Sequence, residues 1–358
     1  MEKRFREMAS RRFLTGFSAT CLWLVALPAS AQSSLTLYGD LDLGAQYLTK
    51  ANSKGNSVFG LQSGNASPTR FGLTGEEDLG SGYKAIFKLE GGFNIANGSN
   101  IVANTPFDRY AYVGMDSPYG KLTLGRQRSL LFERSILYDP TYLAQFSSMS
   151  TNDIPLASLG QNNAIKYETP EWRGLDAALM YGFGQEIPGN SRAARFVSGA
   201  VEYHNDTLGT RAVYEETRGS MTTAPALDES GLVDRRVSLA ARYRIASTTA
   251  YAWFTNVSGD LHLSPAGNVY GGGLSQQISP FLSLVAEVNH YQTHDEQGHP
   301  TWFTVGAFYN LSKRTSLYAF CSTLRINGGS GFTVNTYDFS SPGNENQTGV
   351  QIGINHLF

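Results

Sequence analysis

The sequence contains very little cysteine and little charge. It also lacks a hydrophobic run long enough to span a membrane as a helix. Only two of its 358 residues are cysteines, and Cys21 lies in an N-terminal stretch that we expect to be removed. The single remaining cysteine, Cys321, excludes an internal disulfide framework, so burial and hydrogen bonding must stabilise the fold. Charged residues make up 16% of the chain, against about 25% in an average globular domain. The formal net charge of −2 shows no basic excess of the kind that binds nucleic acid.

The first 31 residues have the three-part organisation of a secretory signal peptide. Five basic residues lie within positions 1–12, the apolar run "FLTGFSATCLWLVALP" follows, and Ala29 and Ala31 form a small-x-small cleavage pattern. The apolar run is shorter than the roughly 20 residues that a membrane-spanning helix needs. We therefore expect cleavage after Ala31, which leaves residues 32–358 as the mature chain, whether translation starts at Met1 or at Met8.

Glycine and aromatic residues, by contrast, are plentiful, with 38 glycines and 12% aromatic residues. Apolar and polar residues alternate in many short segments, for example "RFGLTGE", "YKAIFKLE", "RVSLAARYR" and the C-terminal "GVQIGINHLF". A period of two residues predicts strands with one apolar and one polar face. We place sixteen strands near residues 34–47, 69–79, 83–93, 107–115, 120–127, 163–168, 174–182, 195–204, 208–216, 235–244, 248–256, 267–278, 282–291, 302–310, 315–322 and 346–358.

The connections between these predicted strands alternate between short and long. The short ones include "GSG", "DSPY" and "LSKR", and the long ones include residues 48–68, 128–162 and 217–234. The alternation brings all long loops to one end, as in outer-membrane barrels, whose short turns face the periplasm. A soluble β-sandwich is the alternative, but its loops need not alternate in length. We predict an all-β fold, a 16-stranded antiparallel transmembrane β-barrel whose last strand pairs with its first, because lipid tolerates no free sheet edge.

Several segments resemble the general porins of Gram-negative bacteria, of the β-proteobacterial type. They are "LYGDLDLGAQY", "GEEDLGSGYKAIFKLEGGF", "RYAYVGMDSPYGKLTLGRQ" and the terminal "GINHLF". The resemblance implies an outer-membrane homotrimer with one pore per subunit, surrounded by lipid and lipopolysaccharide, in which the third long loop folds into the pore. It also implies that Phe358 belongs to the signal read by the outer-membrane assembly machinery. It implies no cofactor and no enzymatic activity.

We expect residues 128–162 to form the constriction loop, because a connection this long without structure of its own is usually functional. Its acidic candidates are Glu133 and Asp153, and Glu90 alternates inward on a predicted strand. The basic candidates on the facing wall are Arg70, Arg109 and Lys166. A basic side chain facing lipid at mid-depth costs about 2–4 kcal/mol, which favours an inward position, and the three match the basic cluster of the porins that this chain resembles. Weaker candidates are Arg126, Arg128, Arg236, Arg242 and Arg244, and Asp40 and Asp42 also alternate inward on the first strand.

These residues predict a water-filled channel for passive diffusion of small hydrophilic solutes and ions. A basic wall that faces acidic groups sets a transverse field, and its net charge biases small ions. We therefore expect weak selectivity or a modest preference for anions. The alternatives are a substrate-specific channel for small anions, organic acids or sugars, and a plugged structural barrel or adhesin that conducts nothing.

A metal site and an enzyme are the remaining classes to consider. The stretch "HYQTHDEQGHP" holds His290, His294, Asp295, Glu296 and His299, but the spacing fits no fixed metal-binding template. No nucleophile elbow or ordered Ser–His–Asp arrangement is present in the sequence. We predict neither a metal site nor catalysis.

Overall fold

The computed structural model describes residues 34–150, 159–224, 226–294, 298–326, 331–335 and 346–358, most of them in β-strands. A small hairpin, β11 (Met221–Thr223) and β12 (Ala226–Asp228), lies in one long connection, and α1 (Leu130–Ser135) and η1 (Ile136–Tyr138) lie in another. The strands of the main sheet are β1 (Ser34–Leu48), β2 (Val58–Ser63), β3 (Arg70–Gly80), β4 (Tyr83–Gly92), β5 (Tyr110–Ser117), β6 (Gly120–Arg128), β7 (Gly160–Glu168), β8 (Leu175–Gly182), β9 (Phe196–His204), β10 (Leu208–Arg218), β13 (Val233–Ile245), β14 (Thr248–Gly259), β15 (Gly267–Gln277), β16 (Leu282–Thr293), β17 (Thr301–Asn310), β18 (Thr315–Arg325) and β19 (Gln347–Leu357).

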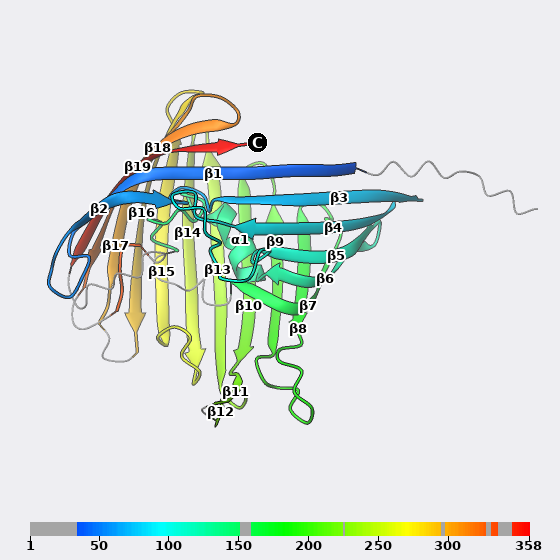
Figure 1. The fold of residues 1–358 in the computed structure, drawn as a ribbon. Coiled ribbons are helices and arrows are strands. Elements are labelled where there is room, and N and C mark those ends of the chain that lie inside the picture. Colours follow the sequence, from blue (N-terminus) through cyan, green and yellow to red (C-terminus); the bar gives the residue numbers. More distant parts are fainter. Residues whose placement is uncertain (1–33, 151–158, 225, 295–297, 327–330, 336–345) are drawn as a thin grey trace, which may run out of the picture.

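The sheet closes on itself through its first and last strands. β1 and β19 pair antiparallel from Asp40 opposite Leu357 to Leu48 opposite Gly349, so the sheet has no free edge here (Figure 1). The chain end continues the pairing, because the Phe358 N–H donates to the Gly39 carbonyl and the Gly39 N–H donates to the Phe358 carbonyl, each at 3.1 Å. The phenylalanine ring covers Gly39 so closely that an added Cβ would lie 2.3 Å from it. The prediction of a closed antiparallel barrel is confirmed.

β2 and β3 together make one of the sixteen barrel strands. β1 pairs with β2 along its second half and with β3 along its first half. Between the two segments residues 64–69 leave the sheet, and the Asp42 carboxylate accepts hydrogen bonds from the backbone N–H groups of Asn65, Ala66 and Ser67 at 2.7–3.3 Å. The sequence analysis was wrong to assign all of residues 48–68 to a loop, because the turn-forming "SGNASP" is an interruption within a strand.

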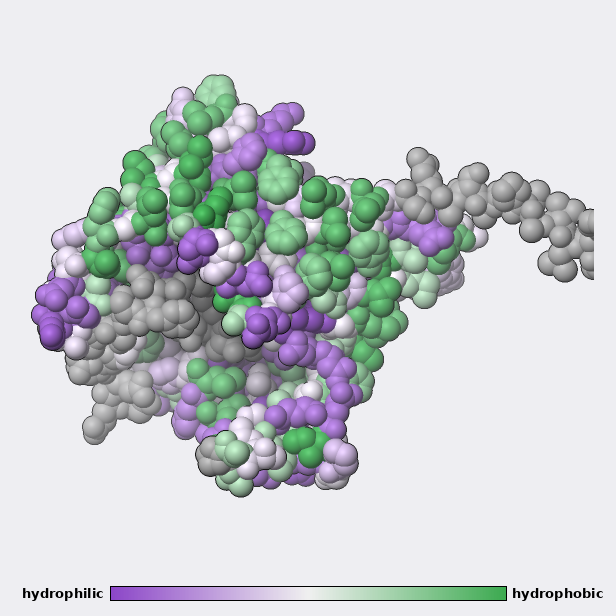
Figure 2. Space-filling view, in the orientation of Figure 1, coloured by the Kyte–Doolittle hydropathy of each residue, from purple (hydrophilic) through white to green (hydrophobic). Residues whose placement is uncertain are grey.

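The outer surface of the strands is apolar and the inner surface is polar. Along β13 the outward Val237 and Leu239 are exposed, whereas the inward Arg236 and Ser238 are buried by polar neighbours. Figure 2 shows apolar side chains spread over the strands and hydrophilic ones gathered toward the rims and the hollow. Among the described residues, the helices are too short and too polar to cross a membrane. The alternation predicted from the sequence is therefore the inside–outside alternation of this barrel.

Candidate pore constriction

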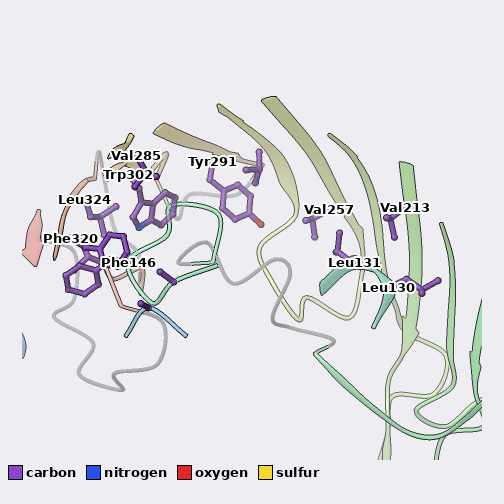
Figure 3. Close-up of a cluster of buried hydrophobic side chains, with 14 of the residues drawn as sticks. Leu130, Leu131, Phe146, Val213, Val257, Val285, Tyr291, Trp302, Phe320 and Leu324 are labelled. Carbon is purple, nitrogen blue, oxygen red and sulfur yellow. The ribbon is translucent and has the colours of Figure 1, made fainter. Parts of the chain in front are cut away.

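The long connection after β6 crosses the interior of the barrel, and its first turn is fixed to one wall. The Ser129 hydroxyl caps α1 by accepting a hydrogen bond of 3.2 Å from the Phe132 N–H. The Leu131 N–H donates to Glu215 on β10 at 2.9 Å. Leu130 and Leu131 are fully buried, and Figure 3 shows them beside the strands that carry Val213 and Val257. The six-residue helix is too short to be stable alone, so the wall holds it in place.

An arginine of this segment binds a group of carboxylates on the same wall. The Arg134 guanidinium lies 2.8 Å from Asp176, 2.9 Å from Glu202 and 3.7 Å from Glu168. The Tyr138 hydroxyl also donates to Glu202, at 3.1 Å. Three charged contacts fix the side chain far more firmly than one exposed ion pair would. The sequence analysis did not select Arg134, because its carboxylate partners lie on three strands that are distant from it in the sequence.

The end of the described segment reaches the opposite side of the barrel. The Gln145 N–H donates to the Asn65 carbonyl at 2.7 Å, and the Thr304 hydroxyl donates to the Phe146 carbonyl at 2.7 Å. The Phe146 ring packs on Gly349 of β19, where an added Cβ would lie 2.4 Å from it. Figure 3 shows Phe146 on the same side as Phe320, away from α1. The connection is thus fixed at both sides of the lumen and narrows it.

A buried carboxyl group organises the turn between these two anchors. Asp139 accepts hydrogen bonds from the Thr141 N–H at 2.7 Å and the Thr141 hydroxyl at 2.8 Å, and a further one from the Ser147 hydroxyl. Glu287 of β16 accepts one from the Ser148 N–H and faces Asp139. Burial raises the pKa of Asp139 above its ordinary value. The turn leaves Tyr142, whose φ is 59°, projecting into the lumen with 57% of its surface exposed.

Three basic side chains surround one carboxylate on the facing wall. Glu90 Oε1 lies 2.6 Å from Arg109 Nε, while Oε2 lies 3.3 Å from Lys88 Nζ and 4.0 Å from Arg70 Nε. The Tyr38 hydroxyl donates to the same Oε2 at 2.6 Å. The structure thus brings the predicted Arg70, Arg109 and Glu90 together. We call the three residues Arg70, Lys88 and Arg109 the basic cluster.

Lys88 is a member of the basic cluster that the sequence analysis did not select. Its ammonium group lies 4.1 Å from the centre of the Tyr110 ring, a cation–π contact that holds it toward the lumen. The signal was present in the sequence, because Lys88 is two residues from Glu90 and therefore faces the same side of β4. Arg70 has a second acidic neighbour, Asp40, whose carboxylate lies 3.0 Å from its Nη2.

The predicted Lys166 and Glu133 form a separate pair. Lys166 Nζ lies 2.8 Å from Glu133 Oε2, and the Tyr110 hydroxyl donates to Glu133 Oε1 at 2.9 Å. The Lys166 side chain is buried, so its charge faces the loop and not the open lumen. The position of the loop brings Glu133 to Lys166. The alternation along the strand alone does not predict this pair. Asp153 lies outside the described residues.

The weaker basic candidates separate into two groups. Arg126 donates to the Asp108 carbonyl at 2.6 Å, Arg128 lies 5.6 Å from the Phe132 ring, and the buried Arg236 is paired with Asp234 at 2.7 Å. Arg242 and Arg244 line an interior hollow instead. Arg126, Arg128 and Arg236 therefore contact groups of the wall and the loop. Arg242 and Arg244 face solvent.

An interior cavity of about 370 Å³ lies between the basic cluster and the loop. Its lining includes the basic cluster together with Phe132, Ile136, Tyr142 and Phe308. A polar, charged wall thus faces the more apolar side of the loop across the narrowed lumen. An arrangement of this kind can orient dipolar and charged solutes in a water-filled passage. Within the described residues, no group of three or more His, Cys, Asp or Glu side chains is placed to hold a metal ion, and Asp295 and Glu296 of the predicted histidine-rich stretch lie outside them.

Comparison with known proteins agrees with this architecture. The family model for Gram-negative porins matches residues 18–329. The chain is 30% identical to outer membrane porin protein 32 of Delftia acidovorans, over 92% of this chain and 95% of that protein. It is 23% identical to major outer membrane protein P.IB of Neisseria gonorrhoeae, over 88% and 94% of the two chains.

The fold also resembles those of solved outer-membrane proteins. An anion-selective porin from Comamonas acidovorans superimposes with a TM-score of 0.75 at 27% identity, over 91% of this chain and 100% of that chain. A trimer form of OmpT from Vibrio cholerae has a TM-score of 0.64 at 15% identity, over 91% and 99% of the two chains. The second likeness concerns the fold alone.

Proposed function

Since this chain belongs to the Gram-negative porin family, we propose that its pore passes small hydrophilic solutes and ions with a modest preference for anions. The protein is an outer-membrane porin. The sign of the preference rests on one observation. The two interior hollows along the lumen are lined by five basic side chains, Arg70, Lys88, Arg109, Arg242 and Arg244, against the acidic Glu90 and Asp206.

The basic cluster is the element that sets the ion preference in this proposal. Glu90 and Asp40 neutralise part of the charge of Arg70, Lys88 and Arg109, and a net positive charge remains at the narrowed level. Lys166 and Glu133 cancel each other. Because an excess of one charge in a narrow passage with low-dielectric walls concentrates the opposite ion, the pore attracts anions. The partial neutralisation keeps the preference modest, and the Comamonas relative, named an anion-selective porin, supports the sign.

The experiment is a reversal-potential measurement in a salt gradient. Arg70→Glu reverses one charge at the basic cluster, and we expect the reversal potential to move toward cation selectivity. Lys313→Glu makes the same change in an exposed short turn and should leave the reversal potential where it is. A wild-type channel that strongly favours cations would refute the proposal.

The same proposal covers processing and assembly. Residues 1–31 serve as the signal peptide, residues 128–162 as the constriction loop, and Phe358 as part of the assembly signal in the outer membrane. We also propose a homotrimer surrounded by lipid and lipopolysaccharide. The trimer form of the Vibrio protein supports the assembly, and so do two apolar grooves of about 510 and 620 Å³ on the outer wall of β15–β19, β1 and β2.

A further inference from the structure

A second interior hollow lies on the short-turn side of the constriction. It has a volume of about 410 Å³, and residues 205–207 and 246–247, which make two of the short turns, are part of its lining. Tyr142 and Phe308 line both this hollow and the cavity beside the basic cluster. A solute that leaves the constriction toward the periplasm therefore meets this space next. We call it the lower hollow.

Two arginines with no ion pair in the described chain face the lower hollow. Arg242 and Arg244 alternate inward on β13, and neither has a described carboxylate within 4.0 Å, unlike Arg134. Gly209 leaves room for Arg242, since an added Cβ would lie 2.8 Å from its Nε. The Arg242 guanidinium lies 5.7 Å from the Tyr138 ring, a contact that helps to hold it in place. Asp206 is the one acidic residue among the described residues of the lining.

Aromatic rings make up the loop side and one wall of the lower hollow. Tyr142 projects from the loop with most of its surface exposed, and Tyr251 comes from β14 with its hydroxyl 3.4 Å from the Ser275 hydroxyl. Phe308 of β17 adds a third ring to the lining. Aromatic faces and edges pair favourably with another ring. The hollow therefore offers two features together, unpaired guanidinium groups and aromatic surface.

We propose that the lower hollow is a binding subsite for aromatic carboxylates. The carboxylate would be bound by Arg242 and Arg244, since guanidinium groups form strong paired hydrogen bonds with carboxylates. The ring of the solute would pack against Tyr142 and Tyr251. A sugar lacks the charge and inorganic phosphate lacks the ring, so each would use only half of the site. Passage through a channel requires weak binding, so we expect millimolar affinity.

The inference rests on the proposed function in one respect, that solutes reach the hollow through the pore. The test is the block of the potassium chloride current in single-channel recordings, with benzoate added on the short-turn side. Acetate carries the charge without the ring, and benzyl alcohol carries the ring without the charge. Benzoate should interrupt the current at concentrations at which neither matched probe does.

The variants locate the block within the pore. Arg242→Gln with Arg244→Gln should raise the half-blocking benzoate concentration at least about tenfold, the effect of losing roughly 1.4 kcal/mol of binding. Lysine at both positions should restore part of the block. Tyr142→Ala with Tyr251→Ala should weaken the benzoate block and leave the response to acetate unchanged.

A matched control removes the same charge elsewhere at the short-turn end. Lys313 and Arg314 are exposed, and replacing both by Gln should leave the block intact. Equal block by benzoate and acetate would overturn the inference. So would a block that disappears in Arg70→Gln but persists in the doubly substituted Arg242 and Arg244 variant. A wild-type channel without anion preference would contradict only the proposed function, because the benzoate effect is read from the current and not from the reversal potential.

Discussion

We expect the electrostatics of the constriction to depend on Glu90. It is almost fully buried and contacts three basic side chains and one tyrosine hydroxyl. A single carboxylate held by so many donors keeps the surrounding cations close together and directed at one point. It also removes one unit of positive charge from the lumen. Glu90 therefore has two opposing effects. It stabilises the basic cluster, and it reduces the positive field that the cluster produces in the lumen.

Glu90→Gln separates these two effects. We expect the reversal potential to shift toward stronger anion preference, because one negative charge leaves the constriction while Arg70, Lys88 and Arg109 remain. We also expect the free energy of unfolding in detergent to fall by about 1.5–3 kcal/mol, the range for hydrogen bonds to charged groups. Glu77→Gln, at an exposed position on β3, is the control for both measurements. A shift toward cation preference would show that the carboxylate does not oppose the basic cluster.

The alternation of polar and apolar residues predicts which side chains of this site face inward. It does not predict the contacts that they make. Period-two alternation predicts that Arg70, Glu90 and Lys166 face inward, because an outward charge would meet lipid. It does not say that Lys166 would be neutralised by Glu133 or that Lys88 would sit over Tyr110. Those contacts depend on where the loop crosses the lumen. The crossing is fixed by hydrogen bonds between residues as distant as Ser148 and Glu287, and no local pattern encodes such pairs.

Among the elements, the strands are predictable and their interruptions are not. The predicted strand at residues 83–93 corresponds to β4, Tyr83–Gly92. The inward turn at residues 64–69 resembles an ordinary loop in sequence, yet Asp42 stabilises it inside a strand. β11 and β12 likewise lie within a connection predicted as a loop. Polar turn residues indicate that a strand stops, but they do not reveal whether it resumes.

We expect the proposed constriction loop to be held more tightly at low pH. Burial raises the pKa of Asp139, so this group favours the folded state fully below its ordinary pKa, and the stabilisation is lost as the pH rises through the raised value. Glu287 faces it from β16, and the two carboxyl groups can share a hydrogen bond only while one proton remains between them. We expect the melting temperature in detergent to fall between acidic and neutral pH for this reason.

Asp139→Asn tests this pH dependence. The amide imitates the protonated acid, since its oxygen still accepts from Thr141 and its nitrogen can donate to Glu287. The melting temperature of the variant should therefore change less with pH than that of the wild type. Glu186→Gln, in an exposed loop, should keep the wild-type pH dependence. An unchanged slope in Asp139→Asn would exclude Asp139 as its source.

At the scale of the whole molecule, the barrel wall changes character around its circumference. On β17 and β18 the large rings of Phe308, Tyr318 and Phe320 point into the barrel. The outer surface there includes the small residues Ala307 and Ala319, among larger ones such as Val305, and forms grooves. On β8 and β9 the outer surface carries larger side chains such as Leu179 and Val201, which are well exposed. A grooved wall of small residues lets another backbone approach closely, whereas long side chains suit fluid lipid.

This asymmetry predicts which wall joins the subunits of the proposed trimer. Ala319→Trp fills the shared edge of both grooves, and overpacking an interface costs typically about 1–3 kcal/mol. Trimers of this variant should dissociate at a lower temperature in sodium dodecyl sulfate, followed by gel electrophoresis without prior boiling. Val201→Trp adds the same ring on the opposite wall and should leave the dissociation temperature unchanged, because lipid accommodates it. If Val201→Trp weakened the trimer and Ala319→Trp did not, the interface would lie on β8 and β9, and the inward rings of β17 and β18 would serve only to fill the barrel.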